Sequence, residues 1–413
     1  MYFLKKIGLS DDIRAFADLA AKFSEVMFAL PSDRLDAACD RYLKTSAKDG
    51  TRDRRSNPQS KSKKKRKPVE KALTPDTPIP KDGKEFKAFL DVKENKTSLQ
   101  SLIGETLIEN APPNKVVVVS GAFEVPLEVR APRLSEQERR ELRCDHEEAD
   151  NRMVISILSS SCKTVIVESN DPDVFIISPA NYHHFKTKDK TVYMKRGQND
   201  YLNITTNAEA LLSKGFDLTS LPLFHALCGC DMSSYPYGIG KATAWKAYTV
   251  YHGLLDGIDC ANPTEEDYAK AEAFMCRMYG DPHNDKLYKM RMRTLLSTSK
   301  AEDDPPTSNA AHHHISRSFC QAARHQYAHM NTHSTLPTPI TSGGFYLNDS
   351  GELTPIMMSN DPMPNVLEEA ITCNCEGSCE TRRSSCYKTG MKCTVLCHKK
   401  LKYSHEKCEN ILG

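Results

Sequence analysis

Six acidic residues of this sequence border apolar runs that have the length of strands or helices. They are Asp40, Glu148, Asp150, Asp171, Asp173 and Asp231. In open α/β sheets, functional side chains gather beyond the carboxyl ends of the strands. If these carboxylates meet there, their repulsion favours divalent cations, and two such ions about 4 Å apart promote phosphodiester hydrolysis. We therefore expect a Mg²⁺ or Mn²⁺ site. The alternative is that these acids, among 54 Asp and Glu, are ordinary surface groups.

A glycine-rich turn, Gly238-Ile239-Gly240-Lys241, precedes a helical pattern. Glycines at a helix N-terminus let backbone N–H groups approach a phosphate, and the helix dipole favours the anion. Contacts from Gly238, Gly240 and Lys241 to nucleic acid are therefore expected. The alternative is an ordinary turn that only connects two elements.

The C-terminal segment is rich in cysteine. Seven of the fifteen cysteines are Cys373, Cys375, Cys379, Cys386, Cys393, Cys397 and Cys408. Such density in a hydrophilic segment of an intracellular protein indicates zinc held by thiolates, which would replace a hydrophobic core. The segment 371–413 also has eight Lys/Arg against four acids, which favours contact with DNA. The alternative is a disordered tail with free thiols.

A second basic segment lies near the N-terminus. Residues 52–68 hold nine Lys/Arg against one acid, and the Pro- and Thr-rich stretch that follows extends this polar insert to residue 84. We expect 52–84 to be disordered. Its run KKKRK at 63–67 is typical of a nuclear import signal, of a sequence-independent phosphate contact, or of a solvated linker.

The elements that position these residues follow from apolar periodicity. Helical patterns occupy 11–30, 85–110, 146–158 and 241–252, and runs of strand length occupy 34–42, 116–120, 163–169 and 173–178. Such alternation predicts an α/β fold with a mostly parallel sheet flanked by helices. Residues 301–370 read as an irregular connector. His312, His313 and His314 within it do not share one helix face, so we interpret them as structural.

Length and composition exclude some classes of protein. The chain has 413 residues, 39% of them hydrophobic, and a net charge of +2. No apolar run approaches the roughly 20 residues of a membrane span, and the N-terminus lacks the pattern of a secretory signal. We expect two domains, at 1–300 and 371–413, in a nuclear or otherwise cytoplasmic protein without membrane contact.

The acidic motifs resemble the flap endonuclease branch of the PIN-like nucleases. Glu148-Ala149-Asp150 is similar to the family's Glu-x-Glu pair, Asp171-Pro172-Asp173 to its Asp-x-Asp pair, and Gly229-Cys230-Asp231 to its Gly-x-Asp. The stretch CDRYLKTSAKDGTRDRR resembles the segment that holds a further metal-binding Asp, here Asp40, and a basic helix. The resemblance implies a PIN-like fold, catalytic Mg²⁺ or Mn²⁺ ions, and phosphate contacts from Lys48 and Arg52.

The chain also resembles, over most of its length, a group of uncharacterised animal proteins, many near mobile elements. The shared words include HEEADNRM, DPDVFII, FHALCGCD and GIGKATAWK. The tail is similar to the tesmin-like CXC module, in which nine cysteines share three zinc ions. That resemblance implies DNA contacts from Arg382, Arg383 and Tyr387. Because two of its cysteine positions are lost, fewer than three ions are expected.

Two hypotheses about function follow. One is a divalent-metal nuclease acting on structured or branched DNA, with a zinc-binding tail that contacts DNA. The other is a catalytically impaired nucleic-acid-binding protein derived from or associated with a mobile element. The resembled family begins with a strand that carries another metal-binding Asp, and Met1–Ser10 contain no acid in that context. Full retention of the ligands favours the first hypothesis, and this difference favours the second.

Overall fold

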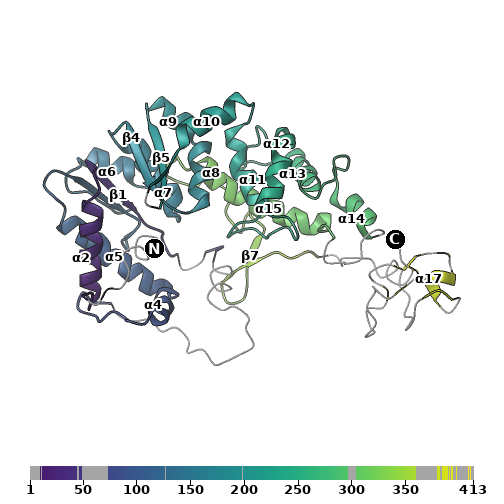
Figure 1. Cartoon of the computed structure of the whole chain (residues 1–413), viewed down its shortest axis with the longest axis horizontal. Helices are drawn as coiled ribbons and strands as arrows, with labels where there is room; N and C mark the ends of the chain where they lie inside the picture. The colour runs from purple at the N-terminus through teal and green to yellow at the C-terminus, as the bar shows by residue number, and fades with distance from the viewer. Residues whose placement is uncertain are drawn as a thin grey trace. The chain divides into compact units, whose positions relative to one another are not determined.

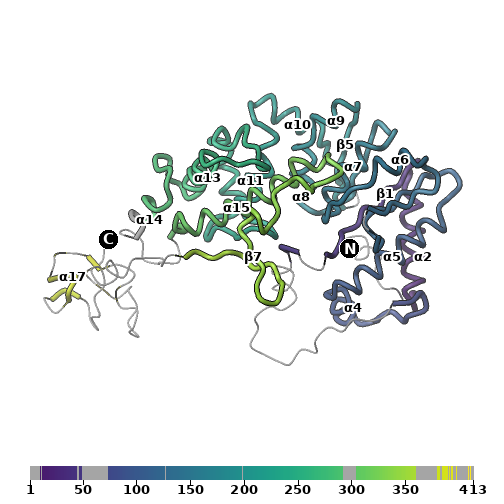
Figure 2. The backbone as a smooth tube through the Cα atoms, turned by 180° about the vertical axis from the view of Figure 1, so that it is seen from behind, coloured from purple at the N-terminus to yellow at the C-terminus, as the bar shows by residue number. Residues whose placement is uncertain are grey.

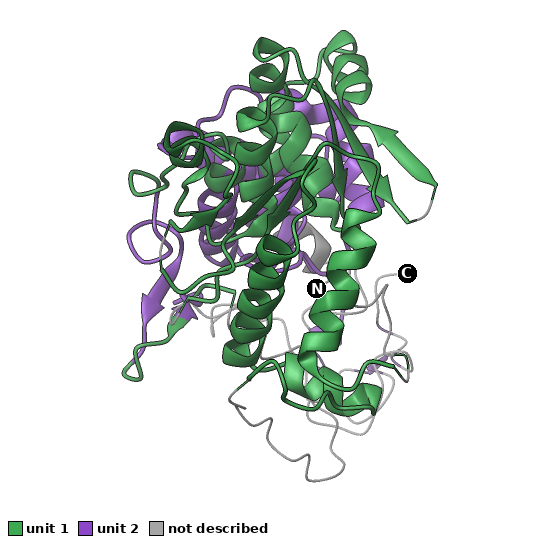
Figure 3. Cartoon of the chain, turned by 90° about the vertical axis from the view of Figure 1, so that its left-hand side faces the viewer, with its two compact units in different colours: residues 1–222, 323–336, 349–353 green, residues 223–322, 337–348, 354–413 purple. Residues whose placement is uncertain are grey.

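The structure is a computed structural model of the whole chain. It describes residues 10, 12–43, 46–48, 73–125, 127–197, 199–295, 304–359, 379–381, 384–388, 390, 392–393, 397, 408 and 410. Contacts within the chain divide it into two compact units (Figure 3). Unit 1 comprises residues 1–222, 323–336 and 349–353, and unit 2 comprises 223–322, 337–348 and 354–413. This division differs from the boundary expected at residue 300.

The N-terminal part of unit 1 is a small sheet covered by helices (Figure 1). Its strands are β1 (Arg34–Ala38), β2 (Val116–Ser120) and β3 (Val129–Arg130). Its helices are α2 (Phe16–Phe28), α4 (Gly83–Leu90), α5 (Lys93–Glu109) and α6 (Glu136–Leu142). β1 and β2 are parallel, whereas β3 is antiparallel to β2. α2 packs on α5, and α5 packs on β2, so that Phe16, Leu99 and Val119 share one buried core.

The remainder of unit 1 contains a second three-stranded sheet. Its strands are β4 (Thr164–Glu168), β5 (Thr191–Arg196) and β6 (Asp200–Asn203). The accompanying helices are α7 (Ala149–Ser159), α8 (Pro172–Ala180), α9 (Tyr182–Thr187), α10 (Ile204–Ser213) and the 3₁₀ turn η1 (Leu218–Ser220). β4 and β5 are parallel, and β6 is antiparallel to β5. α7 packs against β1 and α8, and its Val154 and Ile157 join Val167 of β4 in one core.

These elements confirm the α/β class and correct two expectations. Each sheet pairs one parallel with one antiparallel neighbour, so the sheets are mixed rather than mostly parallel. The connections to β3 and β6 are too short for the crossover that a parallel strand needs. The run 173–178 is helical and forms most of α8 instead of a strand. Asp171 caps this helix and Pro172 occupies its first turn, and both residues favour a helix start over an extended chain.

Unit 2 is mainly helical. Its elements are α11 (Leu221–Leu227), α12 (Lys241–Tyr251), η2 (His252–Leu254), α13 (Glu265–Met278), α14 (Leu287–Leu295), α15 (Ser308–Gln326), β7 (Phe345–Leu347), β8 (Leu353–Pro355) and α17 (Ser385–Lys388). Of these, α11, α15 and β8 each have residues assigned to unit 1. The ring centroids of Phe224 and Tyr248 lie 4.5 Å apart in the aromatic core of unit 2. The expectation of an irregular segment over 301–370 is wrong for 308–326, which form α15 ahead of β7 (Figure 2). The polar composition misled that expectation, because most side chains from Ala311 to Ala323 are buried.

The end of β2 is held close to the end of β1 by a glycine. The backbone N–H of Cys39 donates to the carbonyl oxygen of Ser120 at 2.9 Å. Gly121 follows with a φ of +78°, and a Cβ atom there would lie 2.3 Å from the carbonyl oxygen of Cys39 and 2.9 Å from Nε of Arg152. Glycine therefore permits the approach that brings the residue after Cys39, Asp40, toward α7.

We predict that Gly121→Ala destabilises the chain by about 2–5 kcal/mol, because a left-handed φ and a backbone clash add. Gly197→Ala is the matched control, since Gly197 has a φ of +72° and no atom within 4 Å of the added Cβ. The control should lose only about 1–2 kcal/mol. Urea unfolding of both variants measures the difference, and equal losses would contradict the role given to the close approach.

Candidate metal centre

Asp40 connects the end of β1 to the start of α7. Its Oδ1 accepts a hydrogen bond of 2.9 Å from the backbone N–H of Ala149, the first residue of α7. The backbone N–H of Arg41 donates to the carbonyl oxygen of Glu147 at 2.7 Å. The first N–H groups of a helix have no partner within the helix, and a carboxylate there is also favoured by the helix dipole. Asp40 therefore stabilises α7 from a distant strand and lies beside Glu148.

Asp171 and Asp173 enter the same region from β4. Asp171 lies at the N-cap of α8, where its Oδ1 accepts the backbone N–H of Asp173 at 3.0 Å. Carboxylate oxygens of Asp150, Asp171 and Asp173 all lie within 4.8 Å of one another. The starts of α7 and α8 thus bring their acidic residues together, as the sequence predicted for the ends of strands.

The electrostatics of Asp150 show how tightly the acids are gathered. Burial and four neighbouring carboxylates raise the pKa of Asp150 well above its usual value. In decreasing order of effect, these neighbours are Asp171, Glu148, Asp40 and Asp173. Five of the six predicted carboxylates therefore form one centre, which we call the acidic centre. The carboxylates of such a group are natural ligands for hard divalent cations.

Glu148 has a charged partner in the chain itself. Its Oε2 lies 2.8 Å from Nζ of Lys48, and both side chains are largely buried. The neighbouring Glu147 accepts a hydrogen bond of 2.5 Å from Oγ of Ser46. Lys48 was expected to contact nucleic acid, whereas the structure shows it neutralising part of the acidic centre. Arg52, the second phosphate contact expected near it, lies outside the described residues.

A histidine that was not predicted from the sequence also belongs to this centre. His325 lies near the end of α15, within the part of that helix assigned to unit 1. One of its ring nitrogens and carboxylate oxygens of Glu148 and Asp173 lie within 4.8 Å of one another. No spacing motif joins residues 148, 173 and 325, so only the three-dimensional structure reveals the group.

A pair of stacked histidines also lies next to the acidic centre. Ligand atoms of Asp145, His146 and His333 lie within 4.8 Å of one another, and the two rings stack with centroids 4.0 Å apart. Burial, followed by the effect of His333, lowers the pKa of His146 to about 3, so this ring is neutral. A metal bound by imidazole lies in the plane of the ring, and two stacked rings cannot share one ion in that way. The cluster therefore serves packing.

The sixth predicted carboxylate and the glycine-rich turn lie in unit 2. Asp231 is half-buried in the turn after α11, and its meeting with the other five acids stays a prediction. Gly238 has a φ of +74°, and Gly240 is the N-cap of α12. Lys241 begins α12, and its Nζ lies 3.4 Å from Nε2 of His225. The turn thus has the helix-start geometry that its sequence predicted.

The described cysteines of the tail form two groups that share one member. Sulfur atoms of Cys379, Cys393 and Cys408 lie within 4.8 Å of one another, and so do those of Cys386, Cys393 and Cys397. All five side chains are buried. The arrangement is that of a possible metal-binding cluster. Tyr387 in α17 is half exposed, whereas Cys373, Cys375, Arg382 and Arg383 lie outside the described residues.

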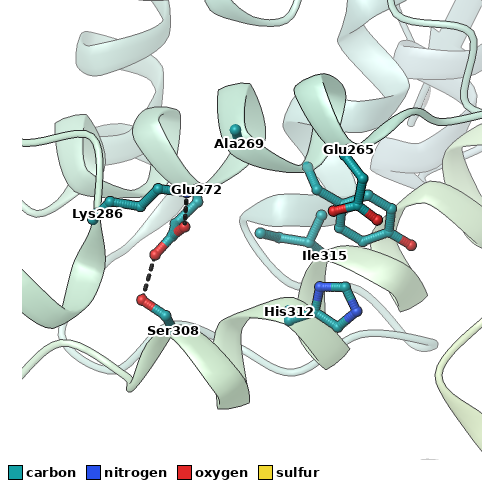
Figure 4. A pocket seen from close by; sticks show the side chains of 8 residues that line it. Glu265, Ala269, Glu272, Lys286, Ser308, His312 and Ile315 are labelled. Carbon is teal, nitrogen blue, oxygen red and sulfur yellow. Dashed lines mark hydrogen bonds and ion pairs between the residues drawn. The ribbon is translucent and has the colours of Figure 1, made fainter.

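A pocket of about 230 Å³ in unit 2 is lined by residues of α13 and α15 and by Lys286 (Figure 4). Its central carboxylate, Glu272, accepts hydrogen bonds from Nζ of Lys286 at 3.0 Å and from Oγ of Ser308 at 2.5 Å. The backbone N–H of Leu287 donates to the same group at 3.0 Å. Through these bonds Glu272 connects three segments of the chain. The carboxylate in the pocket therefore has a structural role.

We predict that Asp150→Asn stabilises the metal-free chain at pH 7, because the raised pKa of Asp150 means that its charged form is unfavourable in the folded chain. A raised pKa in the folded state means that the folded chain holds a proton which the unfolded chain releases above about pH 4. The advantage of the variant should therefore be absent below pH 4 and grow as the pH rises. Thermal unfolding at several pH values in EDTA measures it. Asp189→Asn, at an exposed ion pair with Lys163, is the control that should show no such growth.

Comparisons with known proteins add no family assignment. The chain matches no protein-family model, no curated protein and no solved structure. Within the described ranges, no helix is both long enough and apolar enough to span a bilayer. The resemblances to PIN-like nucleases and to CXC modules therefore stay predictions, and the acidic centre itself carries the case for a function.

Proposed function

We propose that the chain is a divalent-metal-dependent nuclease that hydrolyses phosphodiester bonds in structured DNA. The observation that carries this proposal is the gathering of four carboxylates around the buried Asp150. Burial, followed by these neighbours, raises the pKa of Asp150 well above its usual value. Folding has concentrated negative charge at one place, although dispersed carboxylates would repel one another less. A binding site for cations would account for this concentration of negative charge.

The donor set fits Mg²⁺ or Mn²⁺. Both ions bind carboxylate oxygens, and the acidic centre offers these from three separate segments of unit 1. Asp150, Asp171 and Asp173 would hold one ion. Bound there, divalent cations activate a water molecule and stabilise charge on the leaving oxygen. Asp40 keeps the start of α7 in place through Ala149, and Asp171 does the same for α8.

The ion pair of Lys48 with Glu148 is compatible with this function. The ammonium group of Lys48 compensates Glu148 at 2.8 Å and limits the repulsion within the centre while no cation is bound. A lysine so close to the carboxylates can also attract the phosphate of a substrate. Its expected role in nucleic-acid binding and its observed ion pair are therefore compatible.

Contacts with DNA would come from unit 2 and from the tail. The N-terminus of α12 presents the Gly238–Gly240 turn and Lys241, and the nearby Tyr237 is 60% exposed. Backbone N–H groups and a lysine hold phosphates, while exposed aromatic rings can stack on unpaired bases. These features favour structured DNA with a single-stranded portion.

The tail would bind zinc. The buried cysteines, in two groups that share Cys393, would hold two ions as thiolates. The zinc-bound tail would add basic residues to the DNA-binding surface. Nuclear import through the run 63–67, which lies outside the described residues, would bring the protein to its substrate.

A DNA-binding protein without nuclease activity is the alternative. The ion pair of Lys48 with Glu148 favours it, since an internal cation already compensates one carboxylate. Cleavage and binding assays on the same variants separate the two functions, because phosphate contacts supply most of the affinity for DNA.

We predict that Asp171→Asn and Asp173→Asn each lower cleavage of branched DNA by at least about 100-fold, because each removes a carboxylate that would hold the cation that stabilises negative charge in the transition state. Affinity for the same DNA should change little. Asp189→Asn, in an exposed ion pair, is the control with full activity. Equal cleavage by all four proteins would point to a contaminating nuclease, and absence of cleavage by the unaltered chain with both metals would support the alternative.

A separate prediction concerns the tail. The unaltered chain should contain about two zinc ions under reducing conditions, because the two cysteine groups share a ligand. Cys393→Ser should lose more zinc than Cys408→Ser, which belongs to one group only. Cys162→Ser in unit 1 should leave the zinc content unchanged. Metal analysis of the purified chains measures these contents, and a metal-free tail would contradict the zinc proposal.

A further inference from the structure

His325 is held in one tautomer by its neighbour. The ring is 1% exposed, and its Nδ1 lies 3.0 Å from Oδ1 of Asn151 on α7. An amide oxygen only accepts hydrogen bonds, so Nδ1 must carry the proton. Nε2 is therefore the nitrogen with a lone pair. A hydrogen bond from the second ring nitrogen to a fixed oxygen is the usual way in which proteins orient a metal-binding histidine.

The backbone of His325 is anchored as firmly as its ring. Nδ2 of the fully buried Asn181 donates to the carbonyl oxygen of His325 at 2.9 Å and to that of Ile177 at 2.9 Å. Oδ1 of the same amide lies 3.3 Å from Nδ1 of His329. Asn181 thus connects the C-terminal end of α8 to the end of α15. Since Asp173 lies in the first turn of α8, one helix fixes both a carboxylate and the histidine that faces it.

The ligand atoms divide into two groups with one common member. The first group, Asp150, Asp171 and Asp173, offers only oxygen. The second, Glu148, Asp173 and His325, offers two carboxylates and one imidazole, and only Glu148 and His325 in it are fully buried. A carboxylate has two oxygens, so Asp173 can serve both groups at once.

We propose that the acidic centre is chemically asymmetric, with an all-oxygen site joined through Asp173 to a mixed site completed by Nε2 of His325. This inference rests on the proposed function for the location of the cations and goes beyond it by assigning a new ligand. Imidazole suits transition metals, whereas Mg²⁺ prefers oxygen ligands alone. The mixed site therefore selects a transition-metal dication such as Mn²⁺ over Mg²⁺.

Pulsed electron paramagnetic resonance of Mn²⁺ bound to the full chain tests the proposal, since a directly bound imidazole adds a ¹⁴N modulation. The unaltered chain should show this modulation, and His325→Asn should lose it. Asn can still donate to Asn151 from the position of Nδ1 but has no atom at Nε2. His183→Asn, at an exposed histidine, and His333→Asn, in the stacked pair, should both keep the modulation.

Binding measurements give a second readout. His325→Asn should lower the affinity for Mn²⁺ by about tenfold or more and leave the affinity for Mg²⁺ nearly unchanged. Asn151→Leu should keep the ¹⁴N modulation but weaken Mn²⁺ binding by about tenfold, because the ring loses its orienting bond. Thermal unfolding of each variant verifies that the chain is folded.

The outcomes separate this inference from the nuclease proposal. A ¹⁴N signal that disappears in His325→Asn, in a chain that cuts no DNA, would support the histidine ligand and contradict the nuclease. DNA cleavage by a chain whose Mn²⁺ shows no nitrogen ligand would do the reverse. Persistence of the signal in His325→Asn together with its loss in His333→Asn would overturn the assignment in favour of the stacked pair.

Discussion

Repulsion among carboxylates at the start of α7 is the constraint on which the rest of unit 1 depends. Burial and neighbouring charges together raise the pKa of Asp150, so the folded chain maintains an arrangement that is electrostatically unfavourable. Backbone hydrogen bonds to Asp40 and Asp171 hold two of these acids in place. Hydrophobic packing supplies the remaining stabilisation, because Val154 and Ile157 of α7 are buried against β4 and its neighbours.

α7 transmits this constraint to both sheets. It contacts both β1 and α8, while Glu148 is its N-cap and Asp150 lies in its first turn. A shift of α7 along its axis would therefore move these two acids relative to Asp40 and to Asp173. Gly121 belongs to the same system, since it allows the ends of β1 and β2 to approach closely beside Arg152 of α7. Positions far from any carboxylate thus control the spacing of the ligands.

Much of this could be predicted from local patterns, and the failures have two causes. The β-branched runs at 116–120 and 163–169 and the helical periodicity of 146–158 correspond to β2, β4 and α7, because periodicity reports burial directly. The prediction of a strand at 173–178 is wrong, because a proline and a capping aspartate at the helix start outweigh its β-branched residues. His325 could not be predicted, since its importance arises only when α15 meets α7 and α8. The ion pair of Lys48 with Glu148 also depends on long-range folding that no local signal reports.

The order in which the chain is synthesised has a consequence for unit 1. Residues 323–336 belong to this unit but follow residues 223–322, which belong to unit 2. During translation, both sheets and the helices α7 and α8 leave the ribosome before the segment that carries His325. In a nascent chain that ends at residue 222, Asn151 and Asn181 therefore lack the hydrogen bonds that they make with His325 in the folded chain. A chaperone that protects these residues, or slow translation after residue 222, would affect the yield of the complete centre more than the yield of either sheet.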